Sequence, residues 1–155
     1  MSLRIVHYND PILRKKGVRL SAFDADLATL AREMIATMHA AAGIGLAAQQ
    51  IGRALQLCVI DLRDAEPDFT WELDGVKLPL DLIMPMTIAN PEITVTRGTA
   101  DYLYEEGCLS FPEIRYQTPR AMRAVAKGFN MYGEPITVEG SEFLARALQH
   151  ETDHL

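Results

Sequence analysis

Two histidines and a glutamate near the end of the sequence have the spacing of a metal-dependent hydrolase. His150, Glu151 and His154 form the pattern H-E-x-x-H. On a helix, residues four apart lie on the same face, so both imidazoles can bind one metal ion. The glutamate beside the first histidine can then take a proton from the attacking water. The pattern therefore predicts metal-assisted hydrolysis.

A catalytic metal of this kind usually has three protein ligands and one open position. The sequence ends one residue after His154, so we expect the third ligand from earlier in the chain. Cys108 is the strongest candidate, because a thiolate binds metals well and Gly107 beside it lets the backbone come close. His7 and His39 are alternatives in ordinary packing or surface contexts. A Cys/His/His set with an open position suits zinc or iron(II).

We expect the last helix to run from about Ser141 to the end of the sequence. Two adjacent apolar stripes then carry the site, one with Phe143, Ala147, His150 and His154 and the other with Leu144, Leu148, Glu151 and Leu155. Burying three titratable groups is costly unless they are hydrogen-bonded or bound to a metal. The alternative, two hydrogen-bonded core histidines, is less favoured because both the spacing and the central glutamate are what hydrolysis needs.

Length, composition and charge favour one globular domain, which we expect to span residues 1–155. With 48% hydrophobic residues, a chain of 155 residues can bury a core of its own. The net charge of -6 provides no basic surface for nucleic acid. No apolar run is long enough to span a membrane, and the first residues resemble neither a signal peptide nor a transit segment. A cytoplasmic location follows, in which Cys58 is expected to be a free core thiol.

The expected fold class is α+β, with small mixed or antiparallel β-sheets packed around a C-terminal metal-binding helix, and with an N-terminal helix. That first helix is predicted at about 22–41, after an N-cap at Ser21. Asn90-Pro91 predicts a turn, and 63–75 is interpreted as a loop with a hairpin-like excursion through Phe69-Thr70-Trp71. The predicted strands are 55–62, 78–83, 86–89, 92–97, and a hairpin of 121–131 with 135–138.

Three separated segments carry a family resemblance. They are Gly43-Ile44-Gly45-Leu46-Ala47-Ala48-Gln49-Gln50, Glu106-Gly107-Cys108-Leu109-Ser110 and Gln149-His150-Glu151-Thr152-Asp153-His154. In this order and approximate spacing they resemble the peptide deformylases, which remove the formyl group from the N-terminal formyl-methionine of new bacterial and organellar proteins. Shorter matches connect the three segments, so the resemblance runs from about residue 5 to the end.

The resemblance implies a role for each motif. The metal ligands would be Cys108, His150 and His154, with Glu151 as general base. The oxyanion would be bound by the metal, the backbone N–H of Leu109 and the side-chain amide of Gln50, while the Gly45 backbone would lie against the substrate. The pocket for the methionine side chain would be formed by Ile44, Tyr104, Glu106, Phe143, Arg146 and Ala147, and Arg115 would contact the peptide backbone.

The resemblance also implies a cofactor and a partner. Family members use iron(II) in the cell and also work with nickel, cobalt or zinc, and the partners would be N-formylmethionyl peptides of nascent chains. Tyr104 is bulkier than the short aliphatic residue often found there, so we expect a narrower pocket. Typical members continue past the second histidine. We therefore expect no ribosome docking through a C-terminal extension, and a less firmly held His154.

Two other functions compete with deformylation. A zincin-type peptidase would cut internal peptide bonds, but its third ligand is usually histidine or glutamate, and Cys108 disfavours it. A non-catalytic, degenerate relative would bind metal without turnover. Every residue of the expected chemistry is present, so catalysis is favoured over this second alternative.

Overall fold

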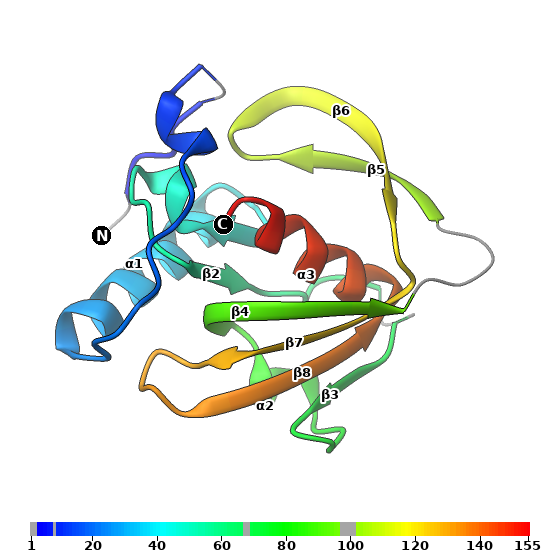
Figure 1. Cartoon of the computed structure of the whole chain (residues 1–155). Coiled ribbons are helices and arrows are strands. Elements are labelled where there is room, and N and C mark those ends of the chain that lie inside the picture. The colour runs from blue at the N-terminus through cyan, green and yellow to red at the C-terminus, as the bar shows by residue number, and fades with distance from the viewer. Residues whose placement is uncertain (1–2, 8, 67–68, 97–101) are drawn as a thin grey trace.

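Two antiparallel sheets and two longer helices form the framework of the molecule (Figure 1). The structure is a computed structural model, and it describes residues 3–7, 9–66, 69–96 and 102–155, without the side chains of residues 96, 102–106 and 111–119. Helix α1 spans Ala25–Ala40 and helix α3 spans Glu142–Asp153. Shorter helices are η1 (Pro11–Arg14), η2 (Ala48–Ile51) and α2 (Leu80–Ile83). None of these helices is long and apolar enough to cross a membrane.

The larger sheet has six strands in the order β1-β2-β4-β7-β8-β3, and each neighbouring pair is antiparallel. The strands are β1 (Gly45–Ala47), β2 (Leu57–Ile60), β3 (Trp71–Leu73), β4 (Met86–Thr96), β7 (Arg123–Phe129) and β8 (Pro135–Ser141). Strand β1, which belongs to the first motif, therefore lies at one edge of the sheet. The α+β prediction is confirmed.

The two long helices cover opposite faces of this sheet, and β2 shows why. Side chains alternate between the faces of a strand. Leu57 and Val59 pack with the apolar side of α1, whereas Cys58 and Ile60 pack with the apolar side of α3. Because both faces are covered, all four residues of β2 are buried. Two cores thus share one sheet.

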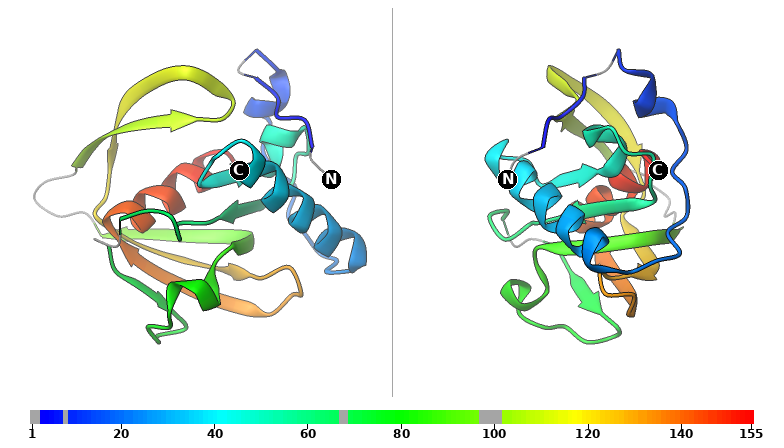
Figure 2. Two further views of the ribbon diagram at one scale, coloured as in Figure 1. Left: turned by 180° about the vertical axis from the view of Figure 1, so that it is seen from behind. Right: turned by 90° about the vertical axis from the view of Figure 1, so that its left-hand side faces the viewer.

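The smaller sheet is a hairpin of β5 (Tyr102–Cys108) and β6 (Phe111–Arg120). Figures 1 and 2 show α3 lying between this hairpin and the six-stranded sheet. An isolated two-stranded hairpin is marginally stable, so its position depends on what it contacts. Its tip, from Cys108 to Phe111, reaches the C-terminal half of α3 and carries the second motif.

Several elements match their predicted positions closely. The β7–β8 hairpin turns at Gly133, which has φ of 81°, and Phe129 pairs with Pro135. Helix α3 starts one residue after Ser141. Helix α1 starts later than predicted, because the N-cap is Asp24 and not Ser21: the Asp24 carboxylate accepts a hydrogen bond from the N–H of Leu27 at 3.0 Å.

The predicted strand over 78–83 is wrong, since the chain forms α2 there. Pro79 occupies the N-cap position, and the proline ring fixes a φ that suits the start of a helix. The N–H of Met84 donates to the Leu80 carbonyl at 2.9 Å, which closes one turn of helix, and Ile83 is the buried residue of this turn.

The predicted turn at Asn90-Pro91 is also wrong. Strand β4 continues through it, with a register shift between Ala89 and Glu92 and with Asn90 at a φ of 52°. The Asn90 side chain is used for a long-range contact, because its Oδ1 accepts from the N–H of Leu20 at 2.7 Å and its Nδ2 donates to the Leu20 carbonyl at 2.8 Å. Strands β5 and β6 have no counterpart among the predicted strands.

Candidate metal centre and active site

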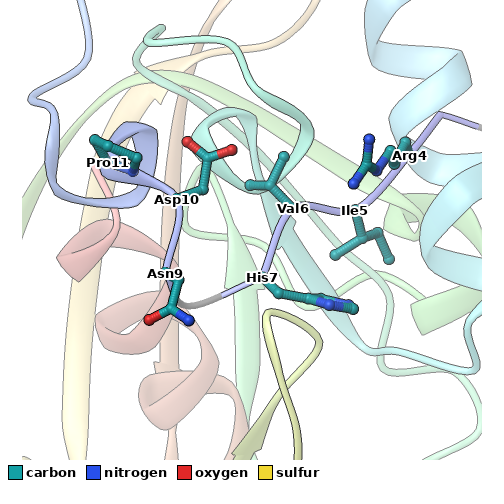
Figure 3. A pocket seen from close by; sticks show the side chains of 7 residues that line it. All are labelled: Arg4, Ile5, Val6, His7, Asn9, Asp10 and Pro11. Atoms are coloured by element: carbon teal, nitrogen blue, oxygen red, sulfur yellow. The ribbon is translucent and has the colours of Figure 1, made fainter.

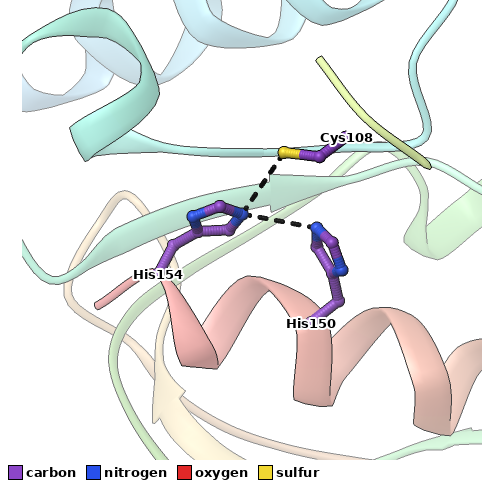
Figure 4. A group of neighbouring side chains, drawn as sticks. All are labelled: Cys108, His150 and His154. Atoms are coloured by element: carbon purple, nitrogen blue, oxygen red, sulfur yellow. Dashed lines mark hydrogen bonds between the residues drawn. The ribbon is translucent and has the colours of Figure 1, made fainter. Parts of the chain in front are cut away.

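The three predicted metal ligands meet where the hairpin tip faces α3 (Figure 4). One donor atom from each of Cys108, His150 and His154 lies within 4.8 Å of the other two. The Nε2 atoms of His150 and His154 are 3.3 Å apart, and His154 Nε2 is 3.6 Å from the Cys108 sulfur. The histidine spacing comes from one turn of helix, whereas the cysteine is brought in by a different sheet.

These distances fit a tetrahedral metal site. With metal–nitrogen bonds of about 2.0–2.1 Å and a metal–sulfur bond of about 2.3 Å, tetrahedral angles place two nitrogens about 3.3 Å apart and a nitrogen and sulfur about 3.6 Å apart. Burial, followed by the neighbouring His150, lowers the pKa of His154 to about 4. A neutral imidazole keeps the lone pair that a metal requires. The residues present therefore suit a divalent metal ion.

Gln50 links the first motif to the second. Its side chain is buried in η2, and its Nε2 donates to the Cys108 sulfur at 3.3 Å and to Ser110 Oγ at 3.2 Å. Its Oε1 accepts from the N–H of Ala47 at 2.8 Å, which fixes the orientation of the amide. The amide therefore supports the hairpin tip, which the larger sheet does not hold through strand pairing.

Glu151 lies against Gly45, on the side of α3 that faces the larger sheet. It is only 3% exposed. A Cβ atom added at Gly45 would lie 2.8 Å from the Glu151 carboxyl carbon and 2.9 Å from its Oε2, closer than real Cβ atoms come. Gly45 has an ordinary extended position in β1, so the glycine is required by this close approach rather than by backbone conformation.

Replacing Gly45 with alanine should therefore displace the Glu151 carboxylate. Because the resemblance implies that Glu151 is the general base, we expect kcat to fall by on the order of a hundredfold, as a misplacement of about 1 Å at a reacting group can cost that much. Steady-state release of formate, the product that the resemblance implies, checks this. Gly140→Ala is the matched control: its Cβ would lie 2.5 Å from Leu144 Cδ2 in the core, so it should lower the melting temperature more than kcat. An unchanged kcat in Gly45→Ala would contradict the argument.

Gln149 attaches α3 to the end of the hairpin. Its Oε1 accepts from the N–H of Ala121 at 2.9 Å, and its Nε2 donates to the Ala121 and Ala145 carbonyls, each at 2.9 Å. The residue directly before His150 thus fixes the helix against the chain that follows β6.

The last turn of α3 is held from its sides. The buried guanidinium of Arg120 pairs with Asp153, and the N–H of Gly17 donates to the Leu155 carbonyl at 3.2 Å. The Leu155 side chain also packs against the core beneath α3. These contacts oppose the expectation that His154 is loosely held.

The remaining predicted residues divide into four groups. Leu109 is at the hairpin tip, where its side chain contacts Gly43. On α3, Ala147 is buried and the Arg146 guanidinium lies 4.4 Å from the centre of the Phe143 ring. Ile44 precedes β1 and is 40% exposed. The side chains of Tyr104, Glu106 and Arg115 lie outside the described part of the structure.

The two alternative histidines are elsewhere. His39 is at the end of α1 and bonds to Asp61 at 2.8 Å. His7 lines a pocket of ≈ 400 Å³ along the N-terminal segment (Figure 3). Cys58 is buried in β2, and burial, with the nearby Glu151 charge, raises the pKa of its thiol well above the usual range. An uncharged buried thiol is a packing group rather than a ligand.

Sequence reasoning gave no role to three polar residues that support the site: Ser110, Arg120 and Gln149. Ser110 is completely buried, and Arg120 is 7% exposed. Ser110 is two residues after Cys108, and Gln149 is one residue before His150. This closeness to candidate ligands was the sequence signal that could have identified both residues.

The fold and this site define a metallohydrolase of the H-E-x-x-H type in which a cysteine completes the set of candidate ligands. Residues 2–155 match the family model of polypeptide deformylase. The chain belongs to the peptide deformylase family, and it is an enzyme that removes the formyl group from N-formylmethionyl peptides.

Individual relatives agree with this assignment. The peptide deformylase of Opitutus terrae is 64% identical over 155 residues, which are 100% of this chain and 81% of that protein. That of Methylacidiphilum infernorum is 41% identical, over 100% of this chain and 80% of the relative. The crystal structure of peptide deformylase from Thermotoga maritima superposes with a TM-score of 0.83 at 34% identity, covering 100% of this chain and 92% of that one.

Proposed function

We propose that Cys108, His150 and His154 hold the catalytic metal and that Glu151 is the general base of deformylation. The convergence of one sulfur and two nitrogens at tetrahedral spacing carries this proposal. When bound, a divalent ion supplies Lewis-acid chemistry to the formyl carbonyl and to the attacking water. A thiolate and two imidazoles suit iron(II), zinc, nickel or cobalt, and we propose iron(II) as the native ion because the motifs resemble those of iron-dependent family members.

Glu151 handles the proton. Its carboxylate is next in sequence to His150 and is buried against Gly45, so it lies beside the candidate ligands and is shielded from bulk solvent. It takes the proton as water attacks the formyl carbon and returns it to the departing amine, while formate leaves.

The oxyanion is stabilised by the backbone N–H of Leu109 and the side-chain amide of Gln50. Both groups are adjacent to the metal ligand Cys108, one through the chain and the other through the 3.3 Å hydrogen bond to sulfur. The two N–H groups of Gln50 face Cys108 and Ser110, so the amide lies beside the candidate ligands, where a developing oxyanion would form.

The substrate peptide lies along the open edge of β1. An edge strand offers unpaired N–H and C=O groups to an extended peptide, and Gly45 leaves the strand without a side chain at this point. The methionine side chain enters a pocket formed by Ile44, Tyr104, Glu106, Phe143, Arg146 and Ala147, with Arg115 on the peptide backbone. The aliphatic side chain of Ile44 is exposed next to β1, where it can contact the methionine side chain of a peptide bound along this strand.

Tyr104 should restrict the pocket. Tyr104→Ile removes a ring and a hydroxyl, so we expect the ratio of kcat/KM for formyl-norleucine to formyl-methionine peptides to change by several-fold, as for one extra or missing methylene in an apolar pocket. Parallel turnover of the two peptides by both proteins measures this. Equal ratios before and after the substitution would show that Tyr104 does not shape the pocket.

The activity itself is tested by formate release from formyl-Met-Ala-Ser under anaerobic conditions, with added iron(II) and separately with zinc. We expect formate with either metal and faster turnover with iron(II). A denatured protein in the same assay should remain uncut. Cleavage of that protein without formate release would favour a zincin-type peptidase, and metal binding without either product would favour a non-catalytic relative.

We also propose that residues 1–155 act as one catalytic domain in the cytoplasm, on nascent chains. Two cores on opposite faces of one sheet support a single folding unit. The substrate class supports the location, because formylated chains arise at cytoplasmic ribosomes in bacteria. The negative net charge of -6 favours a peptide partner over nucleic acid.

A further inference from the structure

A bonded cluster of Asp61, His39 and Arg63 lies at the end of β2, outside the metal site. Asp61 Oδ2 is 2.8 Å from His39 Nε2 and 2.7 Å from Arg63 Nη2, while Asp61 Oδ1 accepts from Arg63 Nε at 3.0 Å. The Asp61 side chain is 8% exposed, whereas those of His39 and Arg63 are 44% and 36% exposed. The carboxylate is thus the buried centre of the cluster, with a guanidinium fork on one side and an imidazole on the other.

The carboxylate is ionised. Burial raises the pKa of Asp61, but the hydrogen bonds from Arg63 and His39 and the Arg63 charge outweigh it and lower the pKa to about 2. An ionised carboxylate only accepts hydrogen bonds, so His39 Nε2 must be the donor.

The cluster joins both ends of the short connection between α1 and β1. His39 is in the last turn of α1, and the N–H of Asp61 donates to the carbonyl of Ile44, just before β1, at 2.9 Å. Asp61 therefore contacts the chain before and after residues 41–43 with two different groups. Gly45 directly follows Ile44. It pairs with Ile60 in the sheet and lies against the Glu151 side chain.

The connection itself is tightly wound and strained. Ala42 has a φ of 55°, a left-handed conformation that is unfavourable for a residue with a side chain. The N–H of Ala42 donates to the His39 carbonyl at 3.0 Å and that of Gly43 to the Met38 carbonyl at 2.9 Å, which is the Schellman pattern of a helix end. A strained segment persists where its surroundings hold it, and the Asp61 cluster supplies such a hold.

We propose that Asp61 is a positioning residue for the active site: held between His39 and Arg63, it fixes the α1–β1 connection and thereby sets where Ile44 and Gly45 lie against the substrate. The proposal rests on the proposed roles of Ile44 and Gly45 in substrate binding. Asp61 touches neither the metal ligands nor the reacting atoms. Its effect is transmitted through the backbone of β1, an edge strand that pairs with β2 alone among the described strands.

Asp61→Asn tests this, because the amide keeps the size of the side chain and the backbone bond to Ile44 but cannot bind the Arg63 fork and the His39 donor as an anion. We expect kcat/KM for formyl-Met-Ala-Ser to fall about tenfold, mostly through KM, since the substrate-facing strand shifts while Glu151 and the ligands remain. Metal content should equal that of the wild type. Amide hydrogen exchange should accelerate at residues 41–46 and stay unchanged in β7 and β8.

Glu139→Gln is the matched control. Glu139 forms an exposed ion pair with Arg123 at 3.8 Å, so the substitution also removes a carboxylate from an ion pair but leaves the connection intact. Its KM and kcat should stay within twofold of the wild type. Arg63→Lys, which keeps the charge but not the fork, should show a smaller rise in KM than Arg63→Gln.

Different results would overturn the positioning role of Asp61 and the proposed function. If the wild type releases formate and the KM of Asp61→Asn is unchanged, the positioning role alone is overturned. This holds also where amide exchange becomes faster over the whole chain. Absence of formate release from the metal-loaded wild type would instead refute the proposed function. If Asp61→Asn does not fold, His39→Gln and Arg63→Gln decide, because their side chains are partly exposed. Wild-type KM in both would overturn the proposal.

Discussion

Glu151→Gln is expected to lower kcat for formate release by about a thousandfold, within the range of roughly 10²–10⁴ that general acid–base catalysis contributes. Glutamine preserves the size of the side chain in a site where a Cβ at Gly45 would already come within 2.8 Å of it. It cannot accept the proton of the attacking water. Steady-state formate release measures the loss, and metal content measured on the same sample shows whether the ligands are intact.

The same experiment separates loss of chemistry from loss of structure. Metal content and melting temperature of Glu151→Gln should stay close to the wild type, because the proposed ligands are Cys108, His150 and His154. Turnover equal to that of the wild type would mean that Glu151 is not the base. A fall in turnover with an equal fall in bound metal would place the effect in the metal site.

Cys108→Ser should release the metal. Serine is nearly the same size as cysteine, but a neutral hydroxyl replaces a thiolate, so one of three protein ligands is lost. We expect metal affinity to fall by more than the roughly 10–100-fold that loss of a supporting hydrogen bond costs, and formate release to fall with it. Metal content after dialysis against a mild chelator measures the first effect.

Cys58→Ala is the control for this substitution. It removes the other cysteine, which is buried in β2 among the apolar residues beneath α3. A small core cavity should lower stability, while the bound metal remains. Retention of metal by Cys108→Ser through the same dialysis would show that the third ligand is a different residue.

Features carried by one short segment were predictable from the sequence. The two histidines and the glutamate lie within five residues of one helix, so helical spacing alone places both imidazoles on one face. The β7–β8 hairpin was equally local, since Gly133 supplies the positive φ of its turn. Helical spacing could not place Cys108. Ligand chemistry and the order of the motifs identified it, although its sheet was not fully predicted.

Features that depend on distant contacts were not predictable in the same way. Asn90-Pro91 reads locally as a turn, yet two hydrogen bonds between Asn90 and Leu20, 70 residues away in sequence, hold the bulge within a continuous strand. Strand β6 contains two prolines, which locally disfavour a strand. Asp61 lies within the predicted strand over 55–62, and only the fold brings His39 to it.

The hairpin of β5 and β6 shares no strand pairing with the larger sheet, and its tip supplies Cys108 while α3 supplies both histidines. An ion bound by all three residues would cross-link two parts of the chain that are far apart in sequence, much as a disulfide closes a loop. The proposed catalytic ion would then also stabilise the fold. Stripping the ion should loosen the hairpin first, so the ability to turn over substrate and the shape of the substrate site would be lost together.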